Sequence, residues 1–162
     1  MTDEMMSKVR RLLHPTDDEL GWYQEVMALD AAEAIPLLIA VLNDEQEKLY
    51  PRRMAATILG LLRDERAIAA LAQTLSASDA SLRASAAEAL GRFEAPEDSL
   101  VQRLIQGLQD DDYFVRETCA KTLGRLKRPD ALPALTRMSI ADSVSTNREV
   151  AQQAIEAIRR AG

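Results

Sequence analysis

The sequence contains a single cysteine, Cys119, and a single histidine, His14. One cysteine cannot form a disulfide within the chain, which is typical of a protein from a reducing compartment. One histidine cannot build a multi-histidine metal site or a Ser-His-Asp relay. There is no glycine-rich phosphate loop, since Gly60, Gly91 and Gly124 each stand alone. We therefore expect no catalytic, cofactor-binding or metal-ligating residues and no cofactor.

Aromatic residues are also scarce, at 4% of the chain. The core must then consist mainly of Leu, Ile, Val and Ala, which suits closely packed helices. No apolar run approaches the roughly 20 residues that a membrane span needs. The first residues are acidic, whereas a secretory signal peptide begins with basic residues. These features predict an all-α protein that is cytoplasmic and has no membrane partner.

The charge balance is acidic, with 26 Asp and Glu against 20 Lys and Arg and a formal net charge of −6. A field of this sign repels the phosphate backbone of nucleic acids. The chain also lacks a basic groove lined by aromatic residues. We therefore predict no nucleic acid partner.

What the sequence does contain is a repeated phrase, clearest over residues 82–93. In three copies an arginine is followed eight residues later by glycine, and in a fourth by glutamate: Arg52 and Gly60, Arg83 and Gly91, Arg116 and Gly124, Arg148 and Glu156. The arginines are spaced 31, 33 and 32 residues apart. A period of this length indicates stacked pairs of helices, an α-solenoid.

Aligning the copies on their arginines reveals columns of one residue type. Small residues stand three places later and large aliphatic residues seven places later: Ala55, Ala86, Cys119 and Ala151, then Leu59, Leu90, Leu123 and Ile155. The small column lets neighbouring helices approach to 8–10 Å, and the aliphatic column supplies buried apolar area. Cys119 stands in the small column, so we interpret it as a buried apolar residue and not as a nucleophile.

The period predicts one domain over residues 1–162, with a degenerate cap pair at 1–30 and repeats at 31–63, 64–95, 96–128 and 129–162. The last copy has Gln152 and Glu156 where earlier copies have alanine and glycine, as expected for a solvated end. Near the other end, Trp22 and Tyr23 replace small residues. These aromatics either cover the open end of the stack or form a docking or dimer surface.

The phrase over residues 112–126, and more broadly residues 31–160, resembles HEAT repeats, in particular the bilin-lyase-type HEAT-like repeats of bacteria and archaea. The resemblance implies a right-handed α-α superhelix of about five helix pairs whose second helices line the concave side. It also implies a structural ladder in which the repeated arginines bind turn carbonyls and the aspartate of a neighbouring turn. The expected ladder residues are Arg52, Arg83, Arg116, Arg148, Asp79 and Asp112. HEAT-like hydroxylases of deoxyhypusine depend on repeated His-Glu pairs, and this sequence has none.

The outer face of the second helices is the candidate binding surface. Its charged residues form the predicted partner-binding set: Arg53, Glu88, Arg92, Glu117, Lys121, Arg125 and Glu149. We expect Glu88 to lie near Lys121, and Arg92 near Arg125. Two guanidinium groups side by side suit a carboxylate. One hypothesis is therefore an acidic segment of a partner protein across Arg92 and Arg125, and the alternative is a solvated charged face.

The leading functional interpretation is a non-enzymatic scaffold or adaptor, because proteins of this fold serve mostly as scaffolds. The alternative is a bilin lyase-like or chaperone-like subunit acting on a bilin-carrying protein, which the narrower resemblance implies. We expect a monomer, or a weak homodimer formed through the N-terminal cap.

The aliphatic column makes a direct prediction about stability. Leu90→Ala removes a side chain that the pattern places in the core, and we expect a loss of roughly 2–5 kcal/mol in the free energy of unfolding. Urea denaturation followed by circular dichroism would measure this loss. A variant as stable as the wild type would contradict the column assignment.

Overall fold

The computed structural model describes residues 2–14, 18–94 and 97–161, and every regular element in these ranges is a helix. The α-helices are α1 (Thr2–Leu12), α2 (Glu19–Met27), α3 (Ala31–Asn43), α4 (Leu49–Leu62), α5 (Ile68–Thr74), α6 (Ala80–Leu90), α7 (Asp98–Gly107), α8 (Tyr113–Arg125), α9 (Leu132–Ala141) and α10 (Ser145–Arg159). Two short 3₁₀ helices, η1 (Glu65–Ala67) and η2 (Pro129–Ala131), precede α5 and α9.

Local sequence determines where several of these helices begin. The Asp30 carboxylate accepts hydrogen bonds from the amides of Ala32 and Glu33 at the start of α3. Asp79 and Asp112 cap α6 and α8 in the same way. Aspartate at this position satisfies amides that have no partner within the helix and places negative charge at the positive end of the helix dipole.

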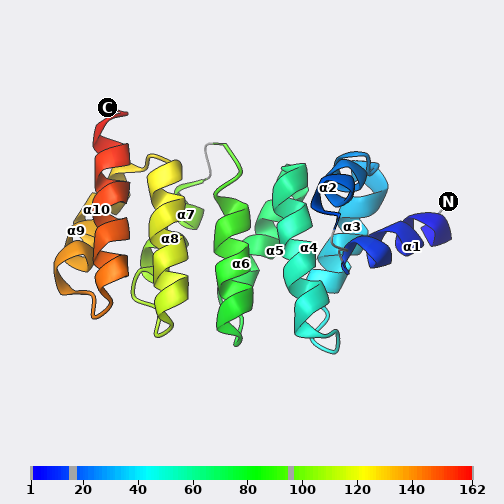
Figure 1. Ribbon diagram of the computed structural model, residues 1–162, viewed down its shortest axis with the longest axis horizontal. Coiled ribbons are helices and arrows are strands. Elements are labelled where there is room, and N and C mark those ends of the chain that lie inside the picture. Colours follow the sequence, from blue (N-terminus) through cyan, green and yellow to red (C-terminus); the bar gives the residue numbers. More distant parts are fainter. Residues whose placement is uncertain (1, 15–17, 95–96, 162) are drawn as a thin grey trace.

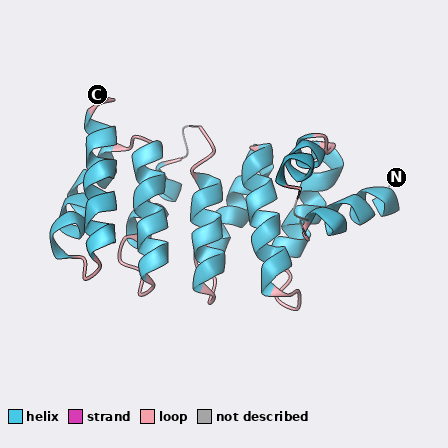
Figure 2. Cartoon of the chain, viewed as in Figure 1, coloured by secondary structure: helices cyan, strands magenta, loops and turns pink. Residues whose placement is uncertain are grey.

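The helices form a right-handed solenoid in two layers (Figure 1). The second helices α4, α6, α8 and α10 stand side by side in one layer, and the first helices α5, α7 and α9 lie behind them. Figure 2 shows that short loops join the two helices of each pair, from α3–α4 to α9–α10. Each second helix packs closely on the next, whereas the first helices are farther apart. The stack therefore curves toward the second-helix layer, which makes that layer the concave side.

Small residues allow the second helices to come so close. A Cβ atom added to Gly60 would lie 2.8 Å from Cα of Ala89, and one added to Gly124 would lie 2.9 Å from Cα of Ala154. Backbone meets backbone at both contacts. The glycine column thus faces the following repeat, and Glu156, which replaces glycine in the last copy, is exposed.

The core runs between the two layers and is aliphatic, as the composition predicts. Leu59, Leu90 and Leu123 of the aliphatic column have no exposed surface. The hydroxyl of Thr122 donates a hydrogen bond of 2.9 Å to the carbonyl of Ala87, which gives a buried polar tie between α6 and α8. Apolar burial therefore supplies much of the adhesion between repeats, and this directed bond helps fix the register of α6 and α8.

The N-terminal pair α1 and α2 closes one end of the stack. The indole N–H of Trp22 donates to the carbonyl of Leu12 at 3.0 Å, and the ring packs against the core. Val26 is fully buried, whereas Tyr23 is 45% exposed. Trp22 therefore covers the end of the core, whereas Tyr23 faces solvent. The repeat boundary expected between residues 95 and 96 lies outside the described residues.

Within the described ranges, no helix combines the length and the apolar character that crossing a membrane requires.

The contact between α4 and α6 predicts an unusual response to alanine. Alanine favours a helix over glycine by about 1 kcal/mol, yet a Cβ atom on residue 60 would meet the backbone of Ala89. We expect Gly60→Ala to lower the free energy of unfolding by about 1–3 kcal/mol, because the two helices must separate. Thermal and urea denaturation would measure the change.

Gly91→Ala is the matched control. A Cβ atom there would meet the side chain of Thr122 at 3.1 Å, and a side chain yields more readily than backbone. The loss should therefore be smaller than for Gly60→Ala. Equal stability of the two variants would show that the backbone contact is unimportant.

Candidate functional site

The concave face carries the charged positions that the sequence selected, but its ion pairs form within single helices. Arg92 Nη2 lies 3.5 Å from Glu88 Oε1 along α6, and Lys121 is paired with Glu117 along α8. Both pairs have the spacing i, i+4, which brings two side chains together on one helix face. Glu88 therefore pairs with Arg92 and Lys121 with Glu117, in place of the expected pair of Glu88 with Lys121.

A groove opens between α8 and α10 on this face. It has a volume of about 560 Å³ and is lined by Lys121, Gly124, Arg125 and Lys127 from α8 and the turn after it, and by Val150, Gln153, Ala154 and Ala157 from α10. We call it the α8–α10 groove. It brings together Lys121 and Arg125 of the predicted partner-binding set. The other members of that set are not among its lining residues: Arg53, Glu88, Arg92, Glu117 and Glu149.

The groove has an apolar floor and a cationic rim. Gly124 and Ala154 meet at its base, so neither contributes a long side chain that would fill it. Val150 and Ala157 add apolar surface from α10. Lys121 forms an ion pair with Glu117. Neither Arg125 nor Lys127 forms an ion pair with any described residue. The groove is therefore locally positive on a chain of net charge −6.

Lys127, Val150 and Ala154 are groove residues that the sequence reasoning did not select. Lys127 follows the end of α8 and has a left-handed backbone with φ of 51°. Arg63, which follows Arg52 by eleven residues as Lys127 follows Arg116, has the same φ, but this position was not among the columns that the sequence analysis defined. Val150, Ala154 and Ala157 have the spacing i, i+4, i+7, which places them on one face of α10. That spacing was the available signal, and it marks the face of α10 that packs toward α8.

A second constellation lies at the turns, where the repeated arginines are found. Each is the fourth residue of its second helix. Arg83 Nε and Nη2 bind the two oxygens of Asp110 at 2.8 and 2.7 Å, and its Nη1 donates to the carbonyls of Ala77 and Ser78. Arg116 binds both oxygens of Asp142 in the same way, at 2.7 and 3.1 Å. We call each such two-pronged contact a rung.

The aspartates of the rungs are not the ones that the sequence assigned. Asp79 and Asp112 are helix caps, and Asp112 accepts from the amides of Phe114 and Val115. The carboxylates that bind arginine are Asp110 and Asp142, two residues closer to the N-terminus within their turns. At the cap position a carboxylate is held by the helix amides, so the guanidinium binds the other turn position.

Charge and hydrogen bonding shift the acidity of both rung carboxyls. The Arg116 guanidinium holds the pKa of Asp142 below its ordinary value, although burial acts in the opposite direction. Burial alone would raise the pKa of Asp110, but hydrogen bonds from Arg83 and from the Asp112 amide outweigh it and lower the pKa overall. Both rungs are therefore charged pairs at neutral pH.

The outer arginines lack a complete rung. Arg148 Nη1 donates to the carbonyl of Asp142 at the last turn. Arg52 Nε donates to the carbonyl of Leu42 at 3.0 Å. Neither forms an ion pair with a residue in the described part of the chain.

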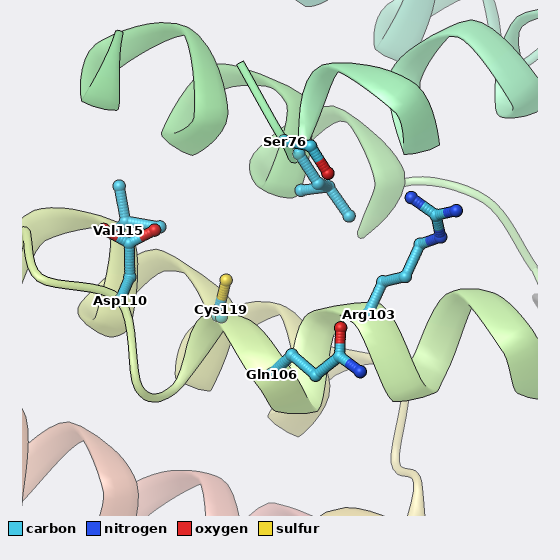
Figure 3. Close-up of a pocket in the computed structure, with 8 residues that line it drawn as sticks. Ser76, Arg103, Gln106, Asp110, Val115 and Cys119 are labelled. Carbon is cyan, nitrogen blue, oxygen red and sulfur yellow. The ribbon is translucent and has the colours of Figure 1, made fainter. Parts of the chain in front are cut away.

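Cys119 lines a small pocket of about 180 Å³ between the end of α5, α7 and α8 (Figure 3). Cys119 is 1% exposed, and burial raises the pKa of its thiol to about 12. The sulfur also packs where a side chain on Gly107 would otherwise stand. Asp110 lines the same pocket but is bound by Arg83. A buried thiol that stays protonated at neutral pH is a poor nucleophile.

His14 packs against an aromatic ring. The imidazole stacks on Tyr50, with ring centroids 6.2 Å apart. Among the residues that the structure describes, no group of three or more His, Cys, Asp or Glu side chains is arranged to hold an ion.

Comparison with known proteins agrees with this architecture. A family model described as HEAT repeats matches residues 19–91 and 68–156. No curated protein sequence matches the chain.

Several solved structures are similar in fold. The complex of CpcE and CpcF of phycocyanin lyase from Nostoc sp. PCC7120 gives a TM-score of 0.78 at 17% identity, covering 95% of this chain and 99% of that one. Human deoxyhypusine hydroxylase gives 0.66 at 23% identity, covering 97% of this chain and 63% of that one. A designed armadillo repeat protein in complex with the peptide (KR)4 gives 0.65 at 17% identity, covering 95% and 81%. Likeness at these identities concerns the fold alone.

The rungs predict how stability depends on pH. Asp142→Asn keeps the side chain's size but removes the charge that Arg116 binds, and we expect the free energy of unfolding at pH 7 to fall by about 1–3 kcal/mol. Because folding lowers the pKa of Asp142, its contribution is complete above the ordinary aspartate pKa of about 3.9 and is lost as the pH falls through the folded-state value. Urea denaturation of both proteins should therefore give a difference that shrinks below about pH 4.

Glu156→Gln is the control, because its ion pair with Arg160 is exposed and contributes little. A difference between wild type and Asp142→Asn that stayed constant from pH 7 to pH 3 would refute the electrostatic origin of the effect.

Proposed function

Because the chain belongs to the family of HEAT-repeat proteins, we propose that it is a non-enzymatic protein-interaction module whose concave second-helix face binds a segment of a partner protein. The observation that carries the proposal is the α8–α10 groove, with its apolar floor and cationic rim. A groove of about 560 Å³ accommodates one or two side chains of a bound segment. The rest of the face offers polar and charged positions over which the segment can continue.

The chemistry of the groove specifies the kind of segment. Val150, Ala154 and Ala157 favour an apolar side chain on the floor. Arg125 and Lys127 favour a carboxylate beside it, since both cations are without an ion-pair partner in the described structure. We therefore propose an acidic segment with an apolar anchor. Arg92 contributes less than the sequence suggested, because Glu88 already neutralises it.

A second candidate function follows from a specific likeness. The match to the structure of the CpcE and CpcF complex covers almost the full length of this chain and of the matched chain. That structure is a complex of two proteins of phycocyanin lyase. This favours a lyase-like or chaperone-like subunit that acts on a bilin-carrying protein together with a second chain. Co-purification with a bilin, detected as visible absorbance, would distinguish this function from a colourless adaptor.

Peptide selection tests the leading proposal. Selection from a random peptide library on the wild-type protein should enrich acidic peptides that carry an apolar residue. The double variant Arg125→Glu/Lys127→Glu should bind the selected peptides at least about tenfold more weakly, because it reverses the rim charge. Fluorescence anisotropy with labelled peptides would measure the dissociation constants.

The matched control is Arg53→Glu, which reverses an exposed charge on α4 away from the groove. It should leave the selected peptides bound as tightly as before. Enrichment of basic peptides, or unchanged binding by the double variant, would overturn the assignment of the groove.

A further inference from the structure

The arginine ladder has a gap at its first position. Each rung joins an arginine to the residue that stands six places before the next repeated arginine. For Arg83 that residue is Asp110, and for Arg116 it is Asp142. For Arg52 it is Ala77, which has no polar side-chain atom. Arg52 therefore has the position of a rung arginine without the carboxylate that completes the rung.

The hydrogen bonds of Arg52 also differ from those of a complete rung. Its Nε donates to the carbonyl of Leu42, whereas the Nε of Arg83 and of Arg116 donates to a carboxylate. The two Nη groups of Arg52 have no hydrogen-bond partner within residues 18–94 of the described structure. A guanidinium group with four such N–H donors favours a planar, two-oxygen acceptor.

A cavity of about 480 Å³ lies beside Arg52, between the α3–α4 and α5–α6 turns. Asn43, Gln73, Ser76 and Ser78 contribute amide or hydroxyl groups that can donate hydrogen bonds. Ala77 also lines this cavity, so the space next to Arg52 includes the place where a rung aspartate would project. The cavity thus combines one cation, neutral donors and room for several heavy atoms.

Two carboxylates line the cavity, and neither neutralises Arg52. Asp79 accepts hydrogen bonds from the Ser81 hydroxyl at 2.5 Å and from the Leu82 amide at 3.0 Å, so it is committed to capping α6. Glu45 is exposed at the mouth of the cavity and forms no ion pair with Arg52. Glu45 is therefore the internal competitor of any anion that enters.

We propose that Arg52 and the cavity beside it bind a carboxylate, which takes the place that Asp110 and Asp142 occupy in the two complete rungs. The carboxylate belongs either to a free small organic acid or to an acidic side chain of a partner protein. This site is separate from the α8–α10 groove and does not depend on it, since the two share no residue.

The test uses two probes on the full chain at constant ionic strength: succinate, and an acetylated, amidated peptide with one central aspartate. Titration followed by ¹⁵N NMR should shift the Arg52 Nε–H and Ala77 amide resonances with at least one probe. Arg52→Gln should weaken that binding at least about tenfold, the loss expected for a hydrogen-bonded ion pair. The ratio of the two affinities identifies the source of the carboxylate.

Two further variants test the missing rung itself. Ala77→Asp supplies the carboxylate from within the chain, so the melting temperature should rise and the response to both probes should disappear. Glu45→Gln removes the competing charge, so the affinity should increase. Circular dichroism would verify that each variant is folded before binding is measured.

The control is Arg53→Gln, which removes a charge one residue away; Arg53 donates to Ser85 and does not line the cavity. It should change the affinity less than about twofold. The groove variant Arg125→Glu/Lys127→Glu should also leave this binding intact, so failure of one site does not imply failure of the other. No response to either probe, or an equal response in Arg52→Gln or Ala77→Asp, would overturn the proposal.

Discussion

The close approach of consecutive second helices is the constraint on which the rest of the structure depends. Gly60 against Ala89 and Gly124 against Ala154 leave no room for a methyl group, so backbone packs on backbone. The first helices contact one another much less than the second helices do. This inequality between the layers curves the stack and makes the second-helix side concave. The same small residues leave the floor of the α8–α10 groove shallow and apolar, so one packing requirement creates both the scaffold and its binding surface.

Periodicity predicted the fold well because it reports on contacts that every repeat makes. The aliphatic and small columns are both buried, and the right-handed solenoid of paired helices is confirmed. The groove was harder to foresee because Lys127, Val150 and Ala154 stand at positions that the sequence columns did not include. Lys127 lies after α8, and Val150 belongs to a face of α10 that becomes a groove wall only where α8 packs beside it. Such a site depends on the placement of two helices, which spacing within one helix cannot give.

The arginine ladder shows a more specific limit of sequence reasoning. The turns contain two positions at which aspartate occurs: one caps the following helix, and the other binds the arginine of the previous repeat. They lie two residues apart, as Asp110 and Asp112 do, and a repeat alignment merges them easily. Only the geometry separates them, because the cap carboxylate faces helix amides and the other faces a guanidinium. When the two positions are aligned separately, the position that binds arginine has aspartate at 110 and 142 but alanine at 77. This difference reveals the missing carboxylate beside Arg52.

The two proposed sites use different cations of the stack, each without an ion-pair partner in the described structure. In a complete rung the aspartate neutralises the charge of the arginine. In an i, i+4 pair such as Glu88 with Arg92, the two charges also largely cancel. Recognition must therefore come from cations that the repeats do not neutralise, and on a chain of net charge −6 such cations are conspicuous. Arg125 and Lys127 lie on the concave face, whereas Arg52 lies among the turns at the edge of the stack. A partner that contacted both would have to follow the stack from its last repeats to its first, which is the extended mode of binding that a solenoid permits.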